Sequence, residues 1–232
     1  MKLRPLHFLP ALAIFLGLGL WMRVSIYSVI PFLHDQGMHQ FSAYLAGFIL
    51  GLLPFLPLAY LMLKREGTPL GGAFLTRRLS FRPLGARQVA LMLGLTVLAF
   101  TATVLASPTQ SWIVNLSPLF QPGEVFHPIQ IPGSATGSLT ESSVAWMGPD
   151  AVGYWPWAVA ILVLFFLNIV GEEILWRGVI WPRQELVYGD RTWLVHGFLW
   201  YLFHLPFYPW FLISGLPQAF ALSYLFQKTR NM

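Results

Sequence analysis

The sequence lacks cysteine and contains few charged residues. The absence of cysteine excludes disulfide bonds, thiolate metal sites and a cysteine nucleophile. Only 10% of the 232 residues are charged, compared with about 25% in soluble domains. Hydrophobic residues make up 56% of the chain, and the mean hydropathy is +0.62. This composition predicts an integral membrane protein.

Basic residues are missing from one long segment and concentrated in another. The 48 residues from 107 to 154 contain no Lys or Arg, whereas residues 64–87 contain six. Lys and Arg are enriched in loops on the cytoplasmic side of a membrane, so this distribution indicates orientation in the membrane. We therefore expect membrane lipid, and no nucleic acid, among the partners.

Apolar runs predict an all-α fold, a polytopic transmembrane bundle of about six helices. The expected spans are approximately 6–30, 42–63, 88–106, 155–181, 192–207 and 210–226. The first begins like a signal peptide but lacks a small-residue cleavage site, so we interpret it as a retained anchor, with a cleaved signal as the alternative. Pro54 and Pro57 predict a kink in the second span. The last two, which are separated by prolines, are either spanning or re-entrant.

Charge counting predicts the orientation of the bundle. With the N-terminus placed inside, twelve of the fourteen Lys and Arg residues fall in inner segments and none in outer segments. This bias predicts that both termini lie inside. We divide the chain into residues 1–154, with the basic inner segment 64–87 and the outer segment 107–154, and residues 155–232, which carry the motifs described next.

Three ionisable residues interrupt the apolar run 155–181, namely Glu172, Glu173 and Arg177. A charge at the bilayer centre costs from about 2.5 to more than 10 kcal/mol, so such residues indicate a functional site. In an α-helix, Glu173 and Arg177 are i,i+4 neighbours in the favourable order, which predicts a structural ion pair. Glu172 points about 100° away from Glu173. It has no such partner on its own helix and is expected to need one across a cavity.

The next expected helix offers two histidines. His196, Trp200 and His204 follow one another at i, i+4 and i+8. A rise of about 1.5 Å per residue places Glu172 and His204 roughly 16 and 20 Å from the inner boundary, so that they could meet near mid-membrane. His196 is expected near the inner surface. A Glu facing a His in a partly dry cavity is a suitable base for activating water, which predicts hydrolysis. The alternatives are a structural Glu172 and a packed His204 without chemistry.

These residues resemble the CPBP intramembrane proteases, the family of CAAX prenyl endopeptidases and bacteriocin-processing or abortive-infection proteins. Its E-E-x-x-x-R motif is matched by Glu172 to Arg177, and its Phe-x-x-x-His motif by Trp200 to His204, with Trp in place of Phe. The resemblance covers about residues 155–230. It implies an intramembrane endopeptidase of the bacterial plasma membrane that hydrolyses membrane-tethered substrates, including prenylated ones. It also implies that Glu172 activates water with His204, while Glu173 and Arg177 shape the site.

Two features of the family leave alternatives open. Its members are called metalloproteases, so Zn²⁺ or another divalent cation is a candidate cofactor, with Glu172 and His204 as candidate ligands. A catalytic zinc normally has three protein ligands, and the two motifs offer fewer. A metal-dependent site and a metal-free site therefore remain alternatives. The family's third motif, His-x-x-x-Asn or Asp, resembles an oxyanion-stabilising pair, but no His follows His204. Since loss of one oxyanion donor costs about 10²–10³ in rate, the alternatives are a truncated member, an impaired enzyme, or a non-catalytic binding or immunity-type protein. A transporter is less favoured, because no inverted repeat is visible.

Overall fold

A computed structural model describes residues 3–67, 84–121 and 154–230. Within these ranges the chain forms helices and turns and no strand, which confirms the predicted all-α fold. Residues 68–83, with most of the basic inner segment, and residues 122–153, with most of the outer segment, lie outside the described residues.

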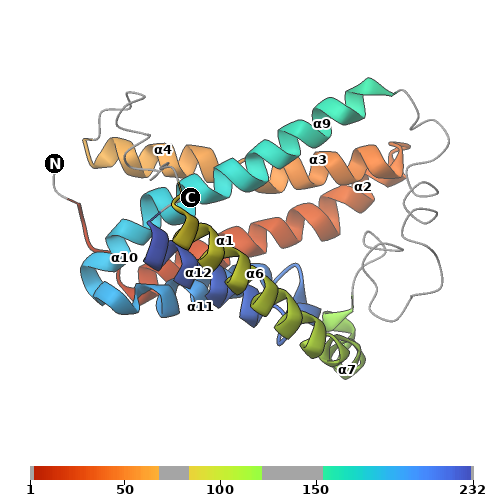
Figure 1. Cartoon of the computed structure of the whole chain (residues 1–232). Coiled ribbons are helices and arrows are strands. Elements are labelled where there is room, and N and C mark those ends of the chain that lie inside the picture. The colour runs from red at the N-terminus through yellow and green to blue at the C-terminus, as the bar shows by residue number, and fades with distance from the viewer. Residues whose placement is uncertain (1–2, 68–83, 122–153, 231–232) are drawn as a thin grey trace.

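The N-terminal part forms two long helical arms (Figure 1). The first arm is α1 (Phe8–Val24), a π-helical segment η1 (Ser25–Val29) and α2 (Ile30–Asp35). The second arm consists of α3 (Gln40–Leu52) and α4 (Phe55–Arg65). The break between α3 and α4 falls at residues 53–54, so the predicted kink is confirmed.

A third long helix, α6 (Ala86–Ala106), lies at the edge of the molecule. It packs on α12 (Leu216–Thr229) and on the short α7 (Pro108–Leu116), and Ala99 is its one buried residue. After α7 comes the 3-10 turn η2 (Pro118–Phe120). The start of segment 107–154 is therefore helical, although the sequence showed it only as a long connection.

The motif-bearing part is one nearly continuous helical run from residue 155 to residue 204. Its elements are α9 (Trp155–Phe165), η5 (Phe166–Gly171), η6 (Ile174–Ile180), α10 (Trp181–Tyr188), η7 (Gly189–Arg191) and α11 (Thr192–His204). Gly189 has a φ of 52°, a left-handed conformation that glycine adopts without steric cost. The chain reverses there, and α11 runs back against α10.

Four segments are long and apolar enough to cross a membrane: Phe8–Asp35, Gln40–Arg65, Ala86–Ala106 and Trp155–His204. The fourth has 50 residues, or about 75 Å of helix, and must therefore fold back within a hydrocarbon core of about 30 Å. The expected spans 192–207 and 210–226 correspond to α11, with 13 residues, and to α12, with 14 residues and a start at Leu216. Both are shorter than the roughly 20 residues of a typical spanning helix. The inside location of both termini stays a prediction.

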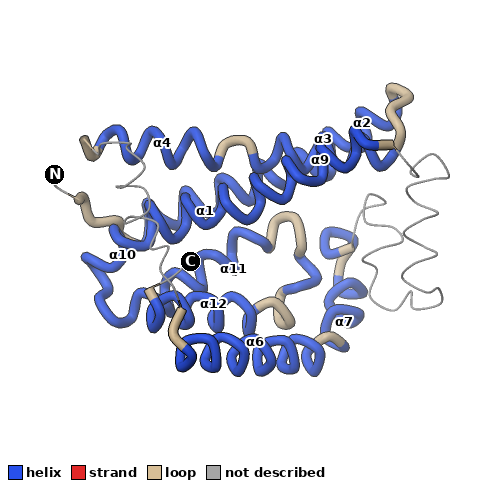
Figure 2. Tube along the Cα trace, turned by 45° about the horizontal axis from the view of Figure 1, so that its top comes forward, coloured by secondary structure: helices blue, strands red, loops and turns tan. Residues whose placement is uncertain are grey.

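The helices form two layers, which Figure 2 shows with α1, α3, α4 and α9 above α11, α12 and α6. Aromatic side chains join the layers around Trp176. Its ring stacks on Phe15 of α1 with the centroids 4.2 Å apart, and it lies 5.3 Å from the rings of Phe55 in α4 and Phe203 in α11. Offset stacked and edge-on contacts between aromatic rings stabilise a core beyond the area that they bury. The core therefore fixes the helix of the acidic motif.

A buried ion pair joins α10 to the end of α4. The Arg183 guanidinium donates to the carbonyl of Val179 at 2.5 Å and to that of Met62 at 3.1 Å, and it pairs with Glu66 at 2.5 Å. The side chains of Arg183 and Glu66 are only 6% and 4% exposed. The backbone N–H of Leu6 donates to the carbonyl of Arg183, so the start of the chain is held at the same end.

A second pair at this end is more exposed. Arg230 follows α12 and pairs with Glu185 of α10. Hydrogen bonding to Glu185 raises the pKa of Arg230 above its ordinary value. Exposed pairs of this kind contribute only about 0–1 kcal/mol to stability.

Substitution of Arg183 tests the buried ion pair. We expect Arg183→Met to lower the free energy of unfolding by about 3–5 kcal/mol, because it removes the buried guanidinium that pairs with Glu66 and donates to the carbonyls of Val179 and Met62. Thermal unfolding of the purified protein in detergent measures this change. Arg191→Met, at an exposed position of η7, is the matched control. Equal melting temperatures for the two variants would show that the buried ion pair does not stabilise the fold.

Candidate active site

The helix that carries the acidic motif departs from α-helical geometry. The π-helical segments η5 and η6 lie on either side of Glu172 and Glu173. Such segments are rare and are frequent at functional sites, and their i→i+5 hydrogen bonds bring residues five apart onto neighbouring positions. Arg177, five residues after Glu172, is close enough for its charge to act on that carboxylate. Its ion-pair partner is nevertheless Glu173, so Glu172 has no ion pair among the described residues.

Two indole groups hold the Glu172 carboxylate. Its Oε2 accepts a hydrogen bond from Trp176 Nε1 at 3.1 Å and another from Trp200 Nε1 at 3.4 Å. Trp176 lies one turn further along the same helix, and Trp200 belongs to α11. The other oxygen, Oε1, has no hydrogen bond to any residue that the structure describes. The partner on the next helix is therefore Trp200, and a second partner lies on the helix of Glu172 itself.

Glu173 and Arg177 form the ion pair that their i,i+4 spacing predicts. Arg177 is buried, and its guanidinium carbon lies 5.9 Å from the ring centroids of both Trp200 and Phe226. A guanidinium within about 6 Å of an aromatic ring gains a cation–π attraction. Arg177 thus connects the acidic helix to α11 and α12.

His204 is the last residue of α11 and is partly buried. Its Nδ1 lies 2.8 Å from the backbone carbonyl oxygen of Trp200. A carbonyl can only accept, so Nδ1 carries a hydrogen and Nε2 carries the lone pair of the neutral ring. The imidazole also meets the rings of Trp200 and Phe203 edge-on, with centroids 4.8 and 4.7 Å apart.

Trp200 connects the two predicted catalytic residues. Glu172 and His204 share no direct hydrogen bond or ion pair in the described part of the chain, but each bonds to a different group of Trp200. The indole N–H reaches Glu172, and the backbone carbonyl holds His204. The family's usual Phe has no N–H, so the Trp in this motif adds a donor. The motif does not by itself show that the Trp200 indole contacts Glu172, and the catalytic roles of Glu172 and His204 stay a prediction.

A cavity of about 240 Å³ opens beside the imidazole. Its walls come from the end of α11, the turn that follows and the start of α12, and they include Trp200, Tyr201, His204, Tyr208, Phe211 and Gln218. Glu172 does not line this cavity and lies next to Trp200 instead. Apolar and aromatic walls with few polar groups are typical of sites for small or chain-like ligands.

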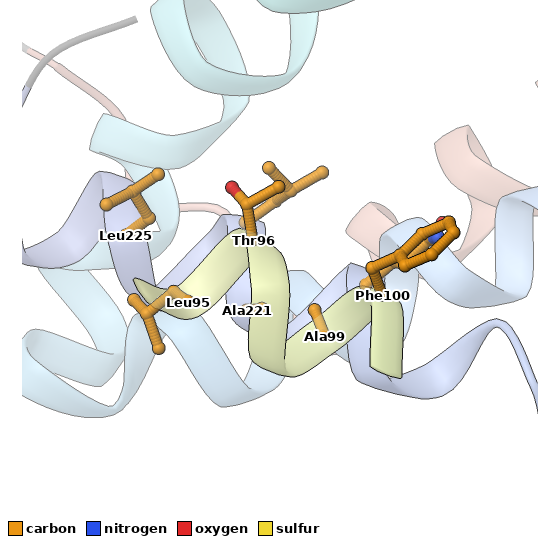
Figure 3. Close-up of a pocket in the computed structure, with 8 residues that line it drawn as sticks. Leu95, Thr96, Ala99, Phe100, Ala221 and Leu225 are labelled. Atoms are coloured by element: carbon orange, nitrogen blue, oxygen red, sulfur yellow. The ribbon is translucent and has the colours of Figure 1, made fainter. Parts of the chain in front are cut away.

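A second groove, between α6 and α12, has a volume of about 160 Å³ (Figure 3). Leu95, Ala99, Phe100 and Leu225 form much of its wall, and no ionisable side chain lines it. It therefore offers no group for acid–base chemistry. Gln218 lines both this groove and the cavity at His204, so the two hollows are neighbours.

His196 is buried inside the protein, and its expected position near the inner membrane boundary stays a prediction. It is 1% exposed, and its Nδ1 lies 2.7 Å from Gln184 Oε1. Its ring packs against Trp181 and Phe15. Residue spacing predicts where a side chain lies along a helix, but not that α1 and α10 cover it. We assign His196 a structural role.

The residues present do not form a three-ligand zinc site. Among the described residues, no three His, Asp or Glu side chains lie close enough together to hold a metal ion. Glu172 and His204 offer at most two ligands, whereas a catalytic zinc usually has three protein ligands. The mechanism proposed below therefore contains no metal step.

Residues 154–232 match the family model described as "Type II CAAX prenyl endopeptidase Rce1-like". This part of the chain, here called the Rce1-like segment, is similar to that family. The resemblance seen in the two motifs is confirmed, and the Rce1-like segment runs from the start of α9 to the end of the chain. No curated protein and no solved structure matches the chain.

A double-mutant cycle tests the bond between Trp176 and Glu172. We expect Trp176→Phe to destabilise the protein by about 1–3 kcal/mol, because the carboxylate loses the shorter of its two hydrogen bonds. In a Glu172→Gln background the same substitution should destabilise the protein less, because a neutral amide loses less than a carboxylate when the Trp176 N–H is removed. Thermal unfolding measures both costs, and Trp112→Phe, at an exposed position of α7, is the control. An identical cost in both backgrounds would contradict the assigned bond.

Proposed function

We propose that the protein is an intramembrane endopeptidase of the CAAX type, which hydrolyses a peptide bond of a membrane-tethered, prenylated substrate. The observation that supports this proposal most is the arrangement around Trp200. An acid from η5–η6 and an imidazole from the end of α11 lie next to one residue, within the Rce1-like segment. Glu172 Oε1 and His204 Nε2 both remain available to a water molecule.

Glu172, His204 and a water molecule carry the proton transfers of the proposed reaction. The Glu172 carboxylate accepts a proton from the water, and the resulting hydroxide attacks the carbonyl carbon of the peptide. His204 Nε2 accepts the second hydrogen bond of the water and so orients its lone pair toward that carbon. When the C–N bond breaks, the proton passes from Glu172 to the leaving amine. The immediate products are a carboxylic acid and a neutral amine, and transfer of the acid's remaining proton to the amine gives a carboxylate and an ammonium group. Both side chains return to their starting states.

The surrounding residues position these groups and supply an apolar binding surface. The bond from His204 Nδ1 to the Trp200 carbonyl fixes the imidazole tautomer. The Glu173–Arg177 pair neutralises the charges next to the reacting acid. The aromatic cavity beside His204 suits the apolar part of a substrate that arrives from the lipid phase.

Cleavage of a prenylated CAAX peptide by the full chain in lipid nanodiscs tests the proposal. We expect Glu172→Gln and His204→Gln each to lower kcat/KM by about 10²–10⁴, the usual contribution of general acid–base catalysis. Glu185→Gln removes a carboxylate of the partly exposed pair with Arg230 and should leave the rate unchanged. Thermal unfolding of each variant shows whether the fold is retained.

Two outcomes would contradict this function. Unchanged cleavage in both Glu172→Gln and His204→Gln would remove the mechanism. Absence of cleavage by the wild type, together with peptide binding that is insensitive to Glu172→Gln, would favour the non-catalytic membrane binding protein.

A further inference from the structure

Arg23 places a positive charge within the first membrane-spanning segment, outside the Rce1-like segment. A charge at this depth is costly and indicates a specific partner. The Arg23 guanidinium donates from Nη1 to the backbone carbonyl of Pro206 at 2.5 Å, and it lies 4.6 Å from the centre of the Tyr27 ring. The Tyr27 hydroxyl donates to the carbonyl of Phe207 at 3.1 Å. Both bonds go to the backbone just after His204.

Gly19 makes a third contact with the same segment. A Cβ atom built on Gly19 would overlap the carbonyl oxygen of Phe203 and would lie 3.1 Å from Cγ of Pro206. Only a residue without a side chain allows α1 to approach α11 this closely. Gly19, Arg23 and Tyr27 are spaced four residues apart, and all three contact the segment from Phe203 to Phe207.

The end of α11 needs donors from another helix. Pro206 has no N–H, so it cannot bond to the carbonyl four residues earlier. The N–H groups of Phe207 and Tyr208 both turn back to the His204 carbonyl, at 3.2 and 2.8 Å. Proline thus removes the helical donor for the Leu202 carbonyl, and the chain leaves the helix at the negative end of its dipole. A guanidinium and a hydroxyl from the first arm satisfy two of the carbonyls that follow.

Two of the three aromatic rings described beside the imidazole belong to this segment. Ring centroids of Phe203 and Phe207 lie 4.7 and 5.5 Å from that of His204. Gly19 contacts the backbone of Phe203, and Tyr27 bonds to the backbone of Phe207. A shift of α1 would therefore move both rings that hold the imidazole in place.

We propose that Gly19, Arg23 and Tyr27 are positioning residues for His204. They fix the backbone from Phe203 to Phe207, so that the imidazole keeps Nδ1 on the Trp200 carbonyl and Nε2 free for the reacting water. The kinetic consequence rests on the proposed function, whereas the state of the imidazole can be measured without any activity. The first membrane span then serves the active site as well as anchoring the chain.

Kinetics in the full-length protein give the first test. We expect Tyr27→Phe to lower kcat on the prenylated peptide by about 3- to 10-fold, and Arg23→Met by about 10- to 100-fold, as for the loss of a neutral and of a charged hydrogen bond. KM should stay within about twofold, because no substrate contact is removed. Arg23→Lys keeps a cation and a donor and should recover part of the loss. Tyr60→Phe and Arg65→Met, on exposed positions of α4, are the matched controls.

The ¹⁵N spectrum of the histidine rings in nanodiscs gives the second test, which does not depend on cleavage. The His204 signals are assigned by their loss in His204→Gln. Wild type and Arg65→Met should show one neutral form with hydrogen on Nδ1, while Arg23→Met and Tyr27→Phe should show mixed or broadened forms. If Arg23→Met fails to fold, the spectrum of Tyr27→Phe, which removes only one oxygen, tests the proposal.

Unchanged His204 spectra in both Arg23→Met and Tyr27→Phe would overturn the proposal, as would kcat values equal to those of the controls. Absence of cleavage by the wild type would instead overturn the proposed function, and the spectra would still decide whether the first arm positions His204.

Discussion

A carboxylate inside a membrane protein must be given hydrogen-bond donors, and at Glu172 two indole groups supply them. Trp176 provides one donor from the same helix, and the aromatic core formed by Phe15, Phe55 and Phe203 holds it. Trp200 provides the other donor from α11, and its carbonyl also binds His204. The position of the acid, the orientation of the imidazole and the packing of the two layers therefore depend on the same few contacts.

The Rce1-like segment does not build this site alone. Residues 154–232 contain both motifs, but Phe15 and Phe55, which pack on Trp176, come from the preceding part of the chain. The buried Arg183 of the segment pairs with Glu66 at the end of α4. The first arm also reaches the backbone after His204 through Arg23 and Tyr27. Helices outside the family match therefore contribute directly to the geometry of the motifs.

Much of this arrangement could be predicted from local sequence pattern. The apolar runs gave the helices, the prolines gave the break near Pro54, and the i,i+4 spacing gave the Glu173–Arg177 pair. The π-helical segments could not be predicted in the same way, because an apolar run indicates a helix but not a local departure from α-helical turns. Trp176 is the i+4 neighbour of Glu172, but spacing alone could not show that its indole turns toward the carboxylate. The burial of His196 could not be predicted because it depends on packing by α1 and α10. The start of α12 at Leu216 follows a proline-containing turn whose course is set by tertiary contacts.

The most direct test of the central claim is whether residues 172 and 204 lie close together across the interface between η5–η6 and α11. Because the chain has no cysteine, a pair of introduced cysteines gives a signal without background. Glu172→Cys with His204→Cys should form an intramolecular crosslink with a short bifunctional thiol reagent in nanodiscs. Glu172→Cys with Leu105→Cys, on the exposed side of α6, should not. Equal crosslinking of both pairs, or of neither, would contradict the account that the acid and the imidazole share one site around Trp200.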